Sequence, residues 1–342
     1  MSPNEMEEDE VKRPFMEDWK IFFGSGEPHD GIDRLPAPPP WRDFDGEVVE
    51  PRTLDDQAST GGSLSFAERT RGQTFQVNDD VVAMVNAALY LRRPLLITGK
   101  PGTGKSSLIH AIAYELKLGD VLEWPINSRS TLQQGLYEYD AVGRLREVQV
   151  GGEDKIEKYL RLGPLGSAFV PSKRPRPLLI DEIDKSDLDL PNDLLNIFEQ
   201  GDFTIPELKR LGGVREIEDF TGRTAYKIVN GHVRCRAFPL VVMTSNGERE
   251  FPMPFLRRCL PLRMAEPDAD LLRKIVRAHL KEEISAEADA RIEKFDSRLK
   301  SKENLATDQL LNAVYMLKGL RNADEKEREQ LLDAILKSLD VY

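Results

Sequence analysis

The chain has 342 residues, of which 40% are hydrophobic and 31% charged, and its formal net charge is −11. At about 100–200 residues per domain, this length predicts two domains with room for an extra arm, and the composition is that of a globular protein with a sizeable core. The acidic balance argues against nucleic-acid binding over the whole surface. A local basic channel stays open, because net charge does not describe how charge is distributed.

Targeting, membrane and disulfide signals are not found in the sequence. Its first ten residues are acidic, which is unlike a secretory signal or a transit peptide. No stretch approaches the ~18 consecutive apolar residues of a membrane span. The two cysteines, Cys235 and Cys259, cannot form a disulfide framework or a zinc site by themselves. We therefore expect a cytoplasmic protein without a membrane span.

Residues 1–70 differ in composition from the rest of the chain. Three consecutive prolines at 38–40 favour extended polyproline II, and a Ser/Gly stretch follows at 59–63. The segment is nevertheless too apolar for a solvated tail, because it contains Trp19, Phe22, Phe23, Trp41 and Phe44. We predict a Pro/aromatic arm over 1–70 that packs on its own body. An arm that clasps a neighbouring subunit, or an aromatic groove of a partner, is the alternative.

From about residue 75 the pattern alternates between helix and strand. Asn78 opens a helix whose apolar positions share one face, and this helix ends at Arg92. A short apolar strand at 95–98 comes next, and a helix at 106–118 follows it. Further short apolar strands are expected at 121–124, 178–180 and 240–243. Such strands, separated by helices, predict an α/β fold in which a parallel sheet is covered on both faces.

Beyond residue 266 the sequence shows only helical spacing of its apolar residues. Four helices are expected there, at 271–280, 286–299, 307–320 and 325–339. The predicted organisation is thus an α/β core over 71–265 followed by a small all-helical domain, a lid, over 266–342. No internal repeat is found.

The strongest motif is Gly99-Lys100-Pro101-Gly102-Thr103-Gly104-Lys105-Ser106, which matches G-x-x-x-x-G-K-[ST] between a strand and a helix. Its glycines let backbone N–H groups surround phosphate oxygens, and the helix N-terminus favours negative charge. We expect Lys105 to reach the β and γ phosphates and the Ser106 hydroxyl to bind Mg²⁺. The motif predicts a P-loop NTPase that binds ATP and Mg²⁺. The candidate nucleotide-binding residues are Gly99, Pro101, Gly102, Thr103, Gly104, Lys105, Ser106 and Ser107.

A second motif has the Walker B form, an apolar strand at 178–180 followed by Asp181 and Glu182. Asp181 is predicted to hold Mg²⁺ through water, and Glu182 to polarise the attacking water. The adjacent glutamate is typical of hydrolases rather than kinases, because hydrolysis needs a water that is activated in line. The run 184–187 faintly resembles the base-reading motif of GTPases. It follows the two acids with no strand between them, so ATP is favoured over GTP.

Two further polar features follow in the chain. The strand at 241–243 leads to Asn246, whose amide could lie beside the γ phosphate; an asparagine that ends a strand in a turn is the alternative. Arg257 and Arg258 come shortly afterwards. Arginines at a helix end are usually solvated, but their place after this strand indicates a finger aimed at a neighbour's nucleotide.

The order of these motifs resembles that of the AAA+ ATPases, and within them the MoxR-type branch, over about residues 71–342. Gly163-Pro164-Leu165 is similar to the GP-[LI] of MoxR proteins, and residues 181–185, Asp-Glu-Ile-Asp-Lys, look like their DEINR. The resemblance implies that Asn246 is sensor 1 and that Arg258, with Arg257 as the alternate, is the finger. It also implies a homo-oligomeric ring, usually a hexamer, because a finger acts in trans.

The resemblance further implies inserted hairpins, which the 76 residues between Lys105 and Asp181 (181 − 105 = 76) would accommodate. Such inserts face the pore or the client, so Tyr137 and Tyr139 are candidates for gripping, that is, directly contacting, a client protein. The alternative is that they are ordinary cross-strand tyrosines of a hairpin. The segments assigned to inserts are 137–146, 221–223 and 226–233.

A sensor 2 arginine, which the family often places early in a late lid helix, is missing from this sequence. The corresponding stretch, 305–310, contains no arginine. Coupling between nucleotide and lid therefore depends on whether Arg273 or Arg277 substitutes for it.

The resulting prediction is an ATP-hydrolysing ring ATPase of MoxR type, a chaperone that remodels or activates a client or adaptor protein. One alternative is a nucleic-acid-translocating motor of restriction type, which the basic run at 172–176 favours and the net charge disfavours. A second alternative is a nucleotide-gated assembly scaffold with little turnover, which the intact Glu182 and Arg258 disfavour. The histidines have no metal-ligand spacing.

Overall fold

The computed structural model describes residues 19–54, 66–281, 283–301, 303, 305–319 and 324–336. The acidic start of the chain, the Ser/Gly stretch at 59–63 and the predicted helix ends at 320 and 339 lie outside the described residues. No helix within the described ranges has the length and apolar content needed to cross a membrane.

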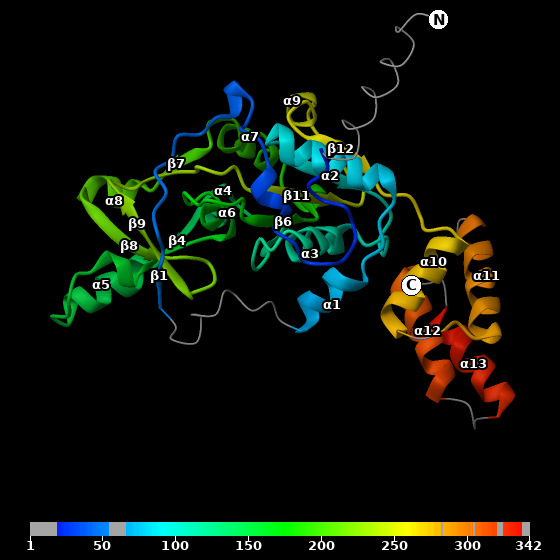
Figure 1. Cartoon of the computed structure of the whole chain (residues 1–342). Coiled ribbons are helices and arrows are strands. Elements are labelled where there is room, and N and C mark those ends of the chain that lie inside the picture. Colours follow the sequence, from blue (N-terminus) through cyan, green and yellow to red (C-terminus); the bar gives the residue numbers. More distant parts are fainter. Residues whose placement is uncertain are drawn as a thin grey trace, which may run out of the picture.

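A five-stranded sheet, parallel throughout, forms the centre of the molecule, with the strand order β12-β2-β11-β6-β3 (Figure 1). Its strands are β2 (Leu95–Thr98), β3 (Leu122–Pro125), β6 (Pro177–Asp181), β11 (Leu240–Ser245) and β12 (Leu260–Arg263). Neighbouring side chains point to opposite faces, so Leu178 and Ile180 belong to one core cluster and Leu179 to the other. The edge strand β12 was not predicted, because it carries only two buried or half-buried leucines between exposed residues.

Helices cover both faces of this sheet, as the sequence predicts. Helices α2 (Asp79–Leu91) and α3 (Lys105–Glu115) contribute to the core on one face, and α7 (Leu190–Gln200) contributes to the core on the other. The helix α3 ends earlier than expected, because Lys117 and Gly119 take positive φ angles of 51° and 88°. The architecture is that of a P-loop NTPase core with flanking helices.

A second sheet lies beside the first, and parts of it come from the segments that the sequence assigned to inserts. Its order is β4-β5-β8-β9-β10-β7, and β1 (Arg52–Thr53) pairs with β9. The other strands are β4 (Tyr137–Tyr139), β5 (Leu160–Leu162), β7 (Asp202–Thr204), β8 (Val214–Glu218), β9 (Thr224–Val229) and β10 (His232–Arg234). Residues 221–223 lie in the turn of the β8–β9 hairpin, so a hairpin is present at one of the predicted inserts.

Three predictions about these inserts are wrong. Residues 137–146 do not form a hairpin, because Asp140 caps a helix, α5 (Ala141–Gln149), by accepting from the backbone N–H of Gly143. Tyr137 is buried and so cannot grip a client, while the hydroxyl of Tyr139 accepts a hydrogen bond from Arg144. The expected strand at 226–233 is interrupted by a turn at Asn230-Gly231, where both residues have positive φ.

Short helices complete the core region. They are α1 (Phe66–Thr74), α4 (Leu132–Leu136), α6 (Pro164–Ala168), α8 (Pro206–Leu211) and α9 (Met253–Leu256), with 3-10 turns at Gly31–Arg34, Pro40–Arg42, Ile156–Lys158 and Ile183–Lys185. Beyond them, four helices share a separate hydrophobic cluster and form the orange-to-red bundle of Figure 1. These are α10 (Ala269–Leu280), α11 (Ala286–Lys300), α12 (Thr307–Gly319) and α13 (Glu325–Ile335). The four predicted helices after residue 266 are confirmed.

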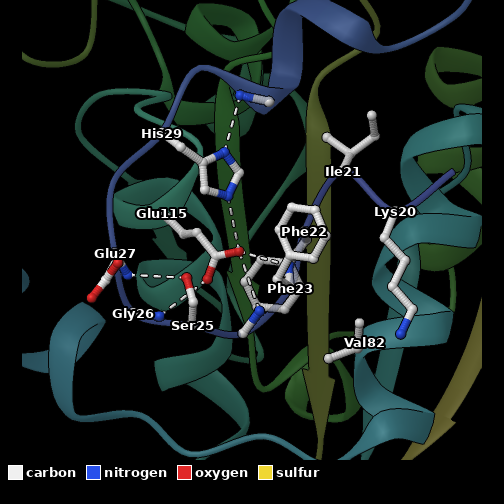
Figure 2. A network of polar contacts seen from close by, with 12 residues as sticks. Lys20, Ile21, Phe22, Phe23, Ser25, Gly26, Glu27, His29, Val82 and Glu115 are labelled. Carbon is white, nitrogen blue, oxygen red and sulfur yellow. Dashed lines mark hydrogen bonds and ion pairs between the residues drawn. The ribbon is translucent and has the colours of Figure 1, made fainter. Parts of the chain in front are cut away.

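The described part of the N-terminal arm packs on the body of its own chain. Ile21 and Phe22 are buried in the same core cluster as α2 and α3. The carboxylate of Glu115, at the end of α3, accepts backbone N–H groups from Phe23, Gly24 and Gly26, and His29 Nε2 lies 3.3 Å from it (Figure 2). Because Glu115 is fully buried, these contacts from the arm satisfy a charge that would otherwise be costly.

Candidate nucleotide-binding site

The carboxyl edge of the parallel sheet brings three of the sequence motifs together. Strand β11 lies between β2 and β6, so the loop after each of the three strands opens at the same edge. Lys105 follows β2, Asp181 ends β6, and Asn246 follows β11. Parallel pairing, rather than closeness in sequence, therefore assembles this site.

The P-loop has the backbone shape that its glycines make possible. Gly102 and Gly104 take φ angles of 76° and 85°, which side chains rarely allow. A Cβ on Gly102 would lie 2.5 Å from the Cβ of Ala306 in the helical lid, and one on Gly104 would lie 2.9 Å from the ring of Phe75. The loop is thus a tight cradle whose outer side faces both the lid and the segment before α2.

The ammonium of Lys105 is held inside this loop. Its Nζ donates to the backbone oxygens of Gly99 and Lys100 at 2.8 and 2.9 Å, and to Oδ1 of Asn246 at 2.8 Å. Burial lowers the pKa of Lys105, and the nearby carboxylates of Asp184, Asp181 and Glu182 oppose that shift. The charge is therefore fixed at the place where phosphates would enter the cradle.

The two residues predicted to hold the metal lie within hydrogen-bond distance of each other. The Ser106 hydroxyl donates to Oδ1 of Asp181 at 2.7 Å, and Thr244 donates to the same oxygen at 2.5 Å. A hydroxyl and a carboxylate are hard oxygen ligands of the kind that Mg²⁺ takes together with phosphate and water. The residues present therefore fit an Mg²⁺ ion bound with a nucleotide, and Ser106 and Asp181 would hold it.

Glu182 adopts a backbone conformation that is rare outside glycine, with a φ of 58°. Its backbone N–H donates to Thr244, which fixes this conformation from the neighbouring strand. In its side chain, Oε2 accepts from Lys185 at 2.7 Å, and Oε1 lies 3.4 Å from Nδ2 of Asn246. The carboxylate is about two-fifths exposed, so it can reach water at the edge of the site.

Asp184 is a site residue that the sequence interpretation did not single out for a role. Its Oδ2 accepts the backbone N–H groups of Asn246 and Glu248, which shapes the loop after β11. Its Oδ1 is buried and has no hydrogen-bond partner among the described residues. The signal that could have found it is its position as the third acid of the 181–184 run, within reach of the next strand's end.

A cavity of about 420 Å³ adjoins the P-loop, which is within the ~300–1,000 Å³ of typical small-molecule sites. It lies between the P-loop, the segment that joins α1 to α2, and the helices α10 and α12 of the lid. Representative lining residues are Phe75, Asn78, Thr103, Ile275, Thr307 and Leu311. The mixture of apolar walls with a few polar groups suits a nucleoside attached to phosphates in the cradle.

The segment that carries these site residues is similar in sequence to a known protein family. Residues 94–259 match the model of the AAA domain (dynein-related subfamily). This segment is an AAA+ domain. The match contains the P-loop, both Walker B acids, Asn246 and the two arginines, while the arm and the lid helices lie outside it.

Solved structures resemble the chain at low sequence identity. Domain III of the replication initiation protein DnaA from Thermotoga maritima has a TM-score of 0.42 and 17% identity, covering 78% of this chain and 97% of that one. The RuvB Holliday junction branch migration motor of the same organism has a TM-score of 0.38 and 16% identity, covering 75% and 67%. No curated protein sequence matches the chain. At these scores the likenesses decide neither a substrate nor a partner.

The two candidate finger arginines lie at the other end of the AAA+ domain's sheet. Strand β12 pairs in parallel with β2, whose carboxyl end leads to the P-loop, and Arg257 and Arg258 precede the opposite, amino end of β12. Arg258 donates to Glu199 at 2.9 Å and to the backbone oxygen of Pro254, and Arg257 is exposed. The structure therefore does not bring either arginine to the P-loop of its own chain.

Neither candidate substitute for sensor 2 lines the cavity in the part of the chain that the structure describes. Arg273 is bound within the lid by the carboxylates of Asp270, Asp289 and Glu293, and Arg277 is exposed. The basic side chains that do line the cavity are those of Arg71, Arg263 and His279. The sequence interpretation missed these, because they come from three different elements and have no motif in common.

Proposed function

We propose that the chain is an ATP-hydrolysing ring ATPase of MoxR type that remodels or activates a client protein. The observation that carries the proposal is the meeting of Lys105, Asp181, Glu182 and Asn246 at one edge of the AAA+ domain's sheet. This combination supplies a phosphate-binding cation, a metal-binding carboxylate, a base and an amide donor. These four groups are among the parts that catalyse the transfer of a phosphoryl group to water.

Each residue would have a distinct part in hydrolysis. Lys105 would exchange its contacts with backbone oxygens for contacts with the β and γ phosphates. Ser106 and Asp181 would hold Mg²⁺, which when bound supplies charge neutralisation at the phosphates. Glu182 would leave Lys185, to which it is hydrogen bonded at 2.7 Å, and take the proton of the attacking water. Asn246 would orient that water through its amide.

The position of Arg258 supports a site shared between two copies of the chain. The four-residue strand β12 separates this arginine from the P-loop edge, which at about 3.3 Å per residue exceeds the reach of a guanidinium on its own nucleotide. We therefore assign Arg258 as a finger in trans, with Arg257 as the alternate. A closed ring, such as a hexamer, gives every site one finger.

The basic run at 172–176 gives less support to a nucleic-acid motor than its sequence suggests. Lys173 pairs with Glu50, and Arg174 pairs with Asp30 and Asp33, all three acids being in the N-terminal arm. Arg176 pairs with Asp219. A run whose charges are matched by acids of the same chain is a weak site for a phosphate backbone, so we favour a protein client.

An ATPase assay tests the enzymatic part of this proposal. The wild type should hydrolyse ATP with a specific activity that rises with protein concentration, whereas Lys105→Ala should lose nucleotide binding and Glu182→Gln should bind ATP without hydrolysing it. A specific activity that does not change with protein concentration would rule out an arginine finger that acts in trans. Stimulation by DNA or RNA would favour the nucleic-acid motor, and binding without turnover would favour the assembly scaffold.

A pull-down tests the client. Glu182→Gln loaded with ATP should retain a client from nuclease-treated native lysate, and Lys105→Ala should not retain it. A protein recovered only with the ATP-loaded variant supports remodelling. Loss of every partner after nuclease treatment contradicts it.

A further inference from the structure

One carboxylate connects the N-terminal arm to the candidate finger. Oε1 of Glu199, near the end of α7, accepts from Nε of Arg258 at 2.9 Å and from a terminal nitrogen of Arg42 at 3.2 Å. Arg42 belongs to the short 3-10 turn at Pro40–Arg42, 157 residues before Glu199 in the sequence. Figure 1 shows the dark-blue arm passing beside α7 at this place.

Arg42 is anchored far more firmly than the other two members of this cluster. Its side chain is 2% exposed, whereas those of Glu199 and Arg258 are 42% and 39% exposed. Its guanidinium also donates to the backbone oxygen of Phe198 and lies 5.8 Å from the centre of the Phe238 ring. An exposed pair of Glu199 and Arg258 alone would be weakly ordered. A buried, planar guanidinium with fixed donors restrains the carboxylate that both arginines share.

We propose that Arg42 is a positioning residue for the finger: it fixes Glu199, and Glu199 sets the direction of Arg258 towards the nucleotide of a neighbouring copy. The inference rests on the proposed function, in which Arg258 acts in trans. The arm, which lies outside the matched AAA+ domain, is thereby a functional part of the ATPase site between two copies.

The charge balance of the cluster supports this role. Two guanidiniums share one carboxylate, so the cluster keeps a net positive charge, and Arg93 adds a further positive charge close to Arg42. A net positive surface attracts a triphosphate. Because Arg42 takes part of the charge of Glu199, Arg258 can exchange that carboxylate for a phosphate more readily.

The first test is steady-state ATPase kinetics. Misplacement of a catalytic group by about 1 Å can cost ~10²-fold, so Arg42→Ala should lower kcat about 10- to 100-fold. KM for ATP and the binding of a fluorescent ATP analogue should change little, because the nucleotide-binding groups are elsewhere. Arg42→Lys should recover only part of the activity, since an ammonium lacks the planar fork.

Two further variants keep the test decisive if Arg42→Ala folds poorly. Glu199→Gln changes a half-exposed side chain and removes the shared charge, so it should fold and lose kcat to a similar degree. Arg52→Ala is the matched control. It removes an arginine of the same arm that pairs with Glu216, away from Glu199, and its kcat should equal that of the wild type.

Subunit mixing separates positioning of the finger from simple damage to the fold. Glu182→Gln subunits cannot hydrolyse ATP but carry an intact finger. Mixed with Arg42→Ala subunits, they should restore activity above that of either variant alone, because the Arg42→Ala sites then receive a good finger. Damage confined to the variant's own fold would not be repaired by a neighbour.

Arg258→Ala, mixed in the same way, distinguishes the two possible failures. If Arg258→Ala is not rescued by Glu182→Gln subunits, the finger in trans of the proposed function is wrong. If Arg258→Ala is rescued but Arg42→Ala and Glu199→Gln are not rescued, then only the positioning role is wrong. The same conclusion follows if Arg42→Ala and Glu199→Gln by themselves keep the kcat of the wild type. The double variant Arg42→Ala/Arg258→Ala should be no slower than Arg258→Ala, because a positioning residue has no effect once its target is gone.

Discussion

The ammonium of Lys105 donates a hydrogen bond to Oδ1 of Asn246 at 2.8 Å across 141 residues of sequence. The same asparagine places its Nδ2 3.4 Å from the carboxylate of Glu182. Asn246 thus connects the P-loop to the Walker B acid. It can do so because β11 lies between β2 and β6 in the sheet.

We predict that Asn246→Ala lowers kcat for ATP hydrolysis by about 10²-fold, the usual cost of losing one preorganised donor, with a smaller change in KM. Steady-state kinetics over a range of ATP concentrations measures both. Asn246→Asp separates the two contacts, because it keeps the acceptor for Lys105 and loses the donor that faces Glu182. Wild-type kcat in Asn246→Ala would rule out the role.

The P-loop should be sensitive to a single methyl group at Gly102. Gly102→Ala combines a positive φ with a Cβ placed 2.5 Å from Ala306 of the lid, so it should weaken nucleotide binding more than tenfold, read by titration with a fluorescent ATP analogue. Gly119→Ala is the matched control, because it has a φ of 88° but no atom within 4 Å of the added Cβ. Equal loss of affinity in both variants would show that backbone strain alone is responsible.

The arm should contribute measurably to stability through Asn86. This fully buried side chain accepts from the backbone N–H groups of Ile21 and Phe22 and donates to the backbone oxygen of Phe22. Asn86→Ala leaves these buried groups without partners, at about 1–3 kcal/mol for each, so thermal unfolding should begin several degrees lower. Gln73→Ala, which removes an exposed hydrogen bond to Tyr114, should shift the midpoint little. An unchanged midpoint in Asn86→Ala would mean that the arm is not held there.

Both cysteine thiols should be inert in the folded protein. Burial raises the pKa of Cys235 and of Cys259 to about 12 each. The thiolate fraction at pH 8 is then about 10⁻⁴, and it rises on unfolding as the pKa returns to its ordinary value of ~8.5. Since the folded state holds these protons more tightly, the associated stability is present below the unfolded pKa and is lost as pH rises towards 12.

The measurement is the rate of reaction with a disulfide reagent at pH 8, with and without guanidinium. We expect slow reaction of the native protein and rapid reaction of two thiols in denaturant. Rapid reaction of a native thiol, with the fold shown to be intact by circular dichroism, would contradict the burial of that cysteine.

Local pattern was sufficient for the parts of this protein whose physics is local. The P-loop depends on glycines at fixed spacing, the core strands on short apolar runs, and the lid on helical periodicity, and each of these can be read within a few consecutive residues. Asp181 and Glu182 could likewise be placed at a strand's end, because an apolar run predicts where the strand stops.

Local pattern failed where structure depends on distant partners. The segment after Tyr139 becomes a helix that Asp140 caps, although the family resemblance implied a hairpin there. Tyr137 is buried because β4 pairs with β5 and packs this tyrosine into the core. The composition of the segment does not predict this burial.

The sequence by itself determined that this chain has a phosphate-binding loop, a Walker B strand and a helical end. Only the tertiary structure decided that Asp184 shapes the loop of Asn246, that the arm's acids match the basic run, and that Arg42 shares Glu199 with Arg258. The physical reason is that the position of a charged side chain depends on the group that it pairs with, and these paired groups are distant in sequence. Folding alone brings them within hydrogen-bond distance.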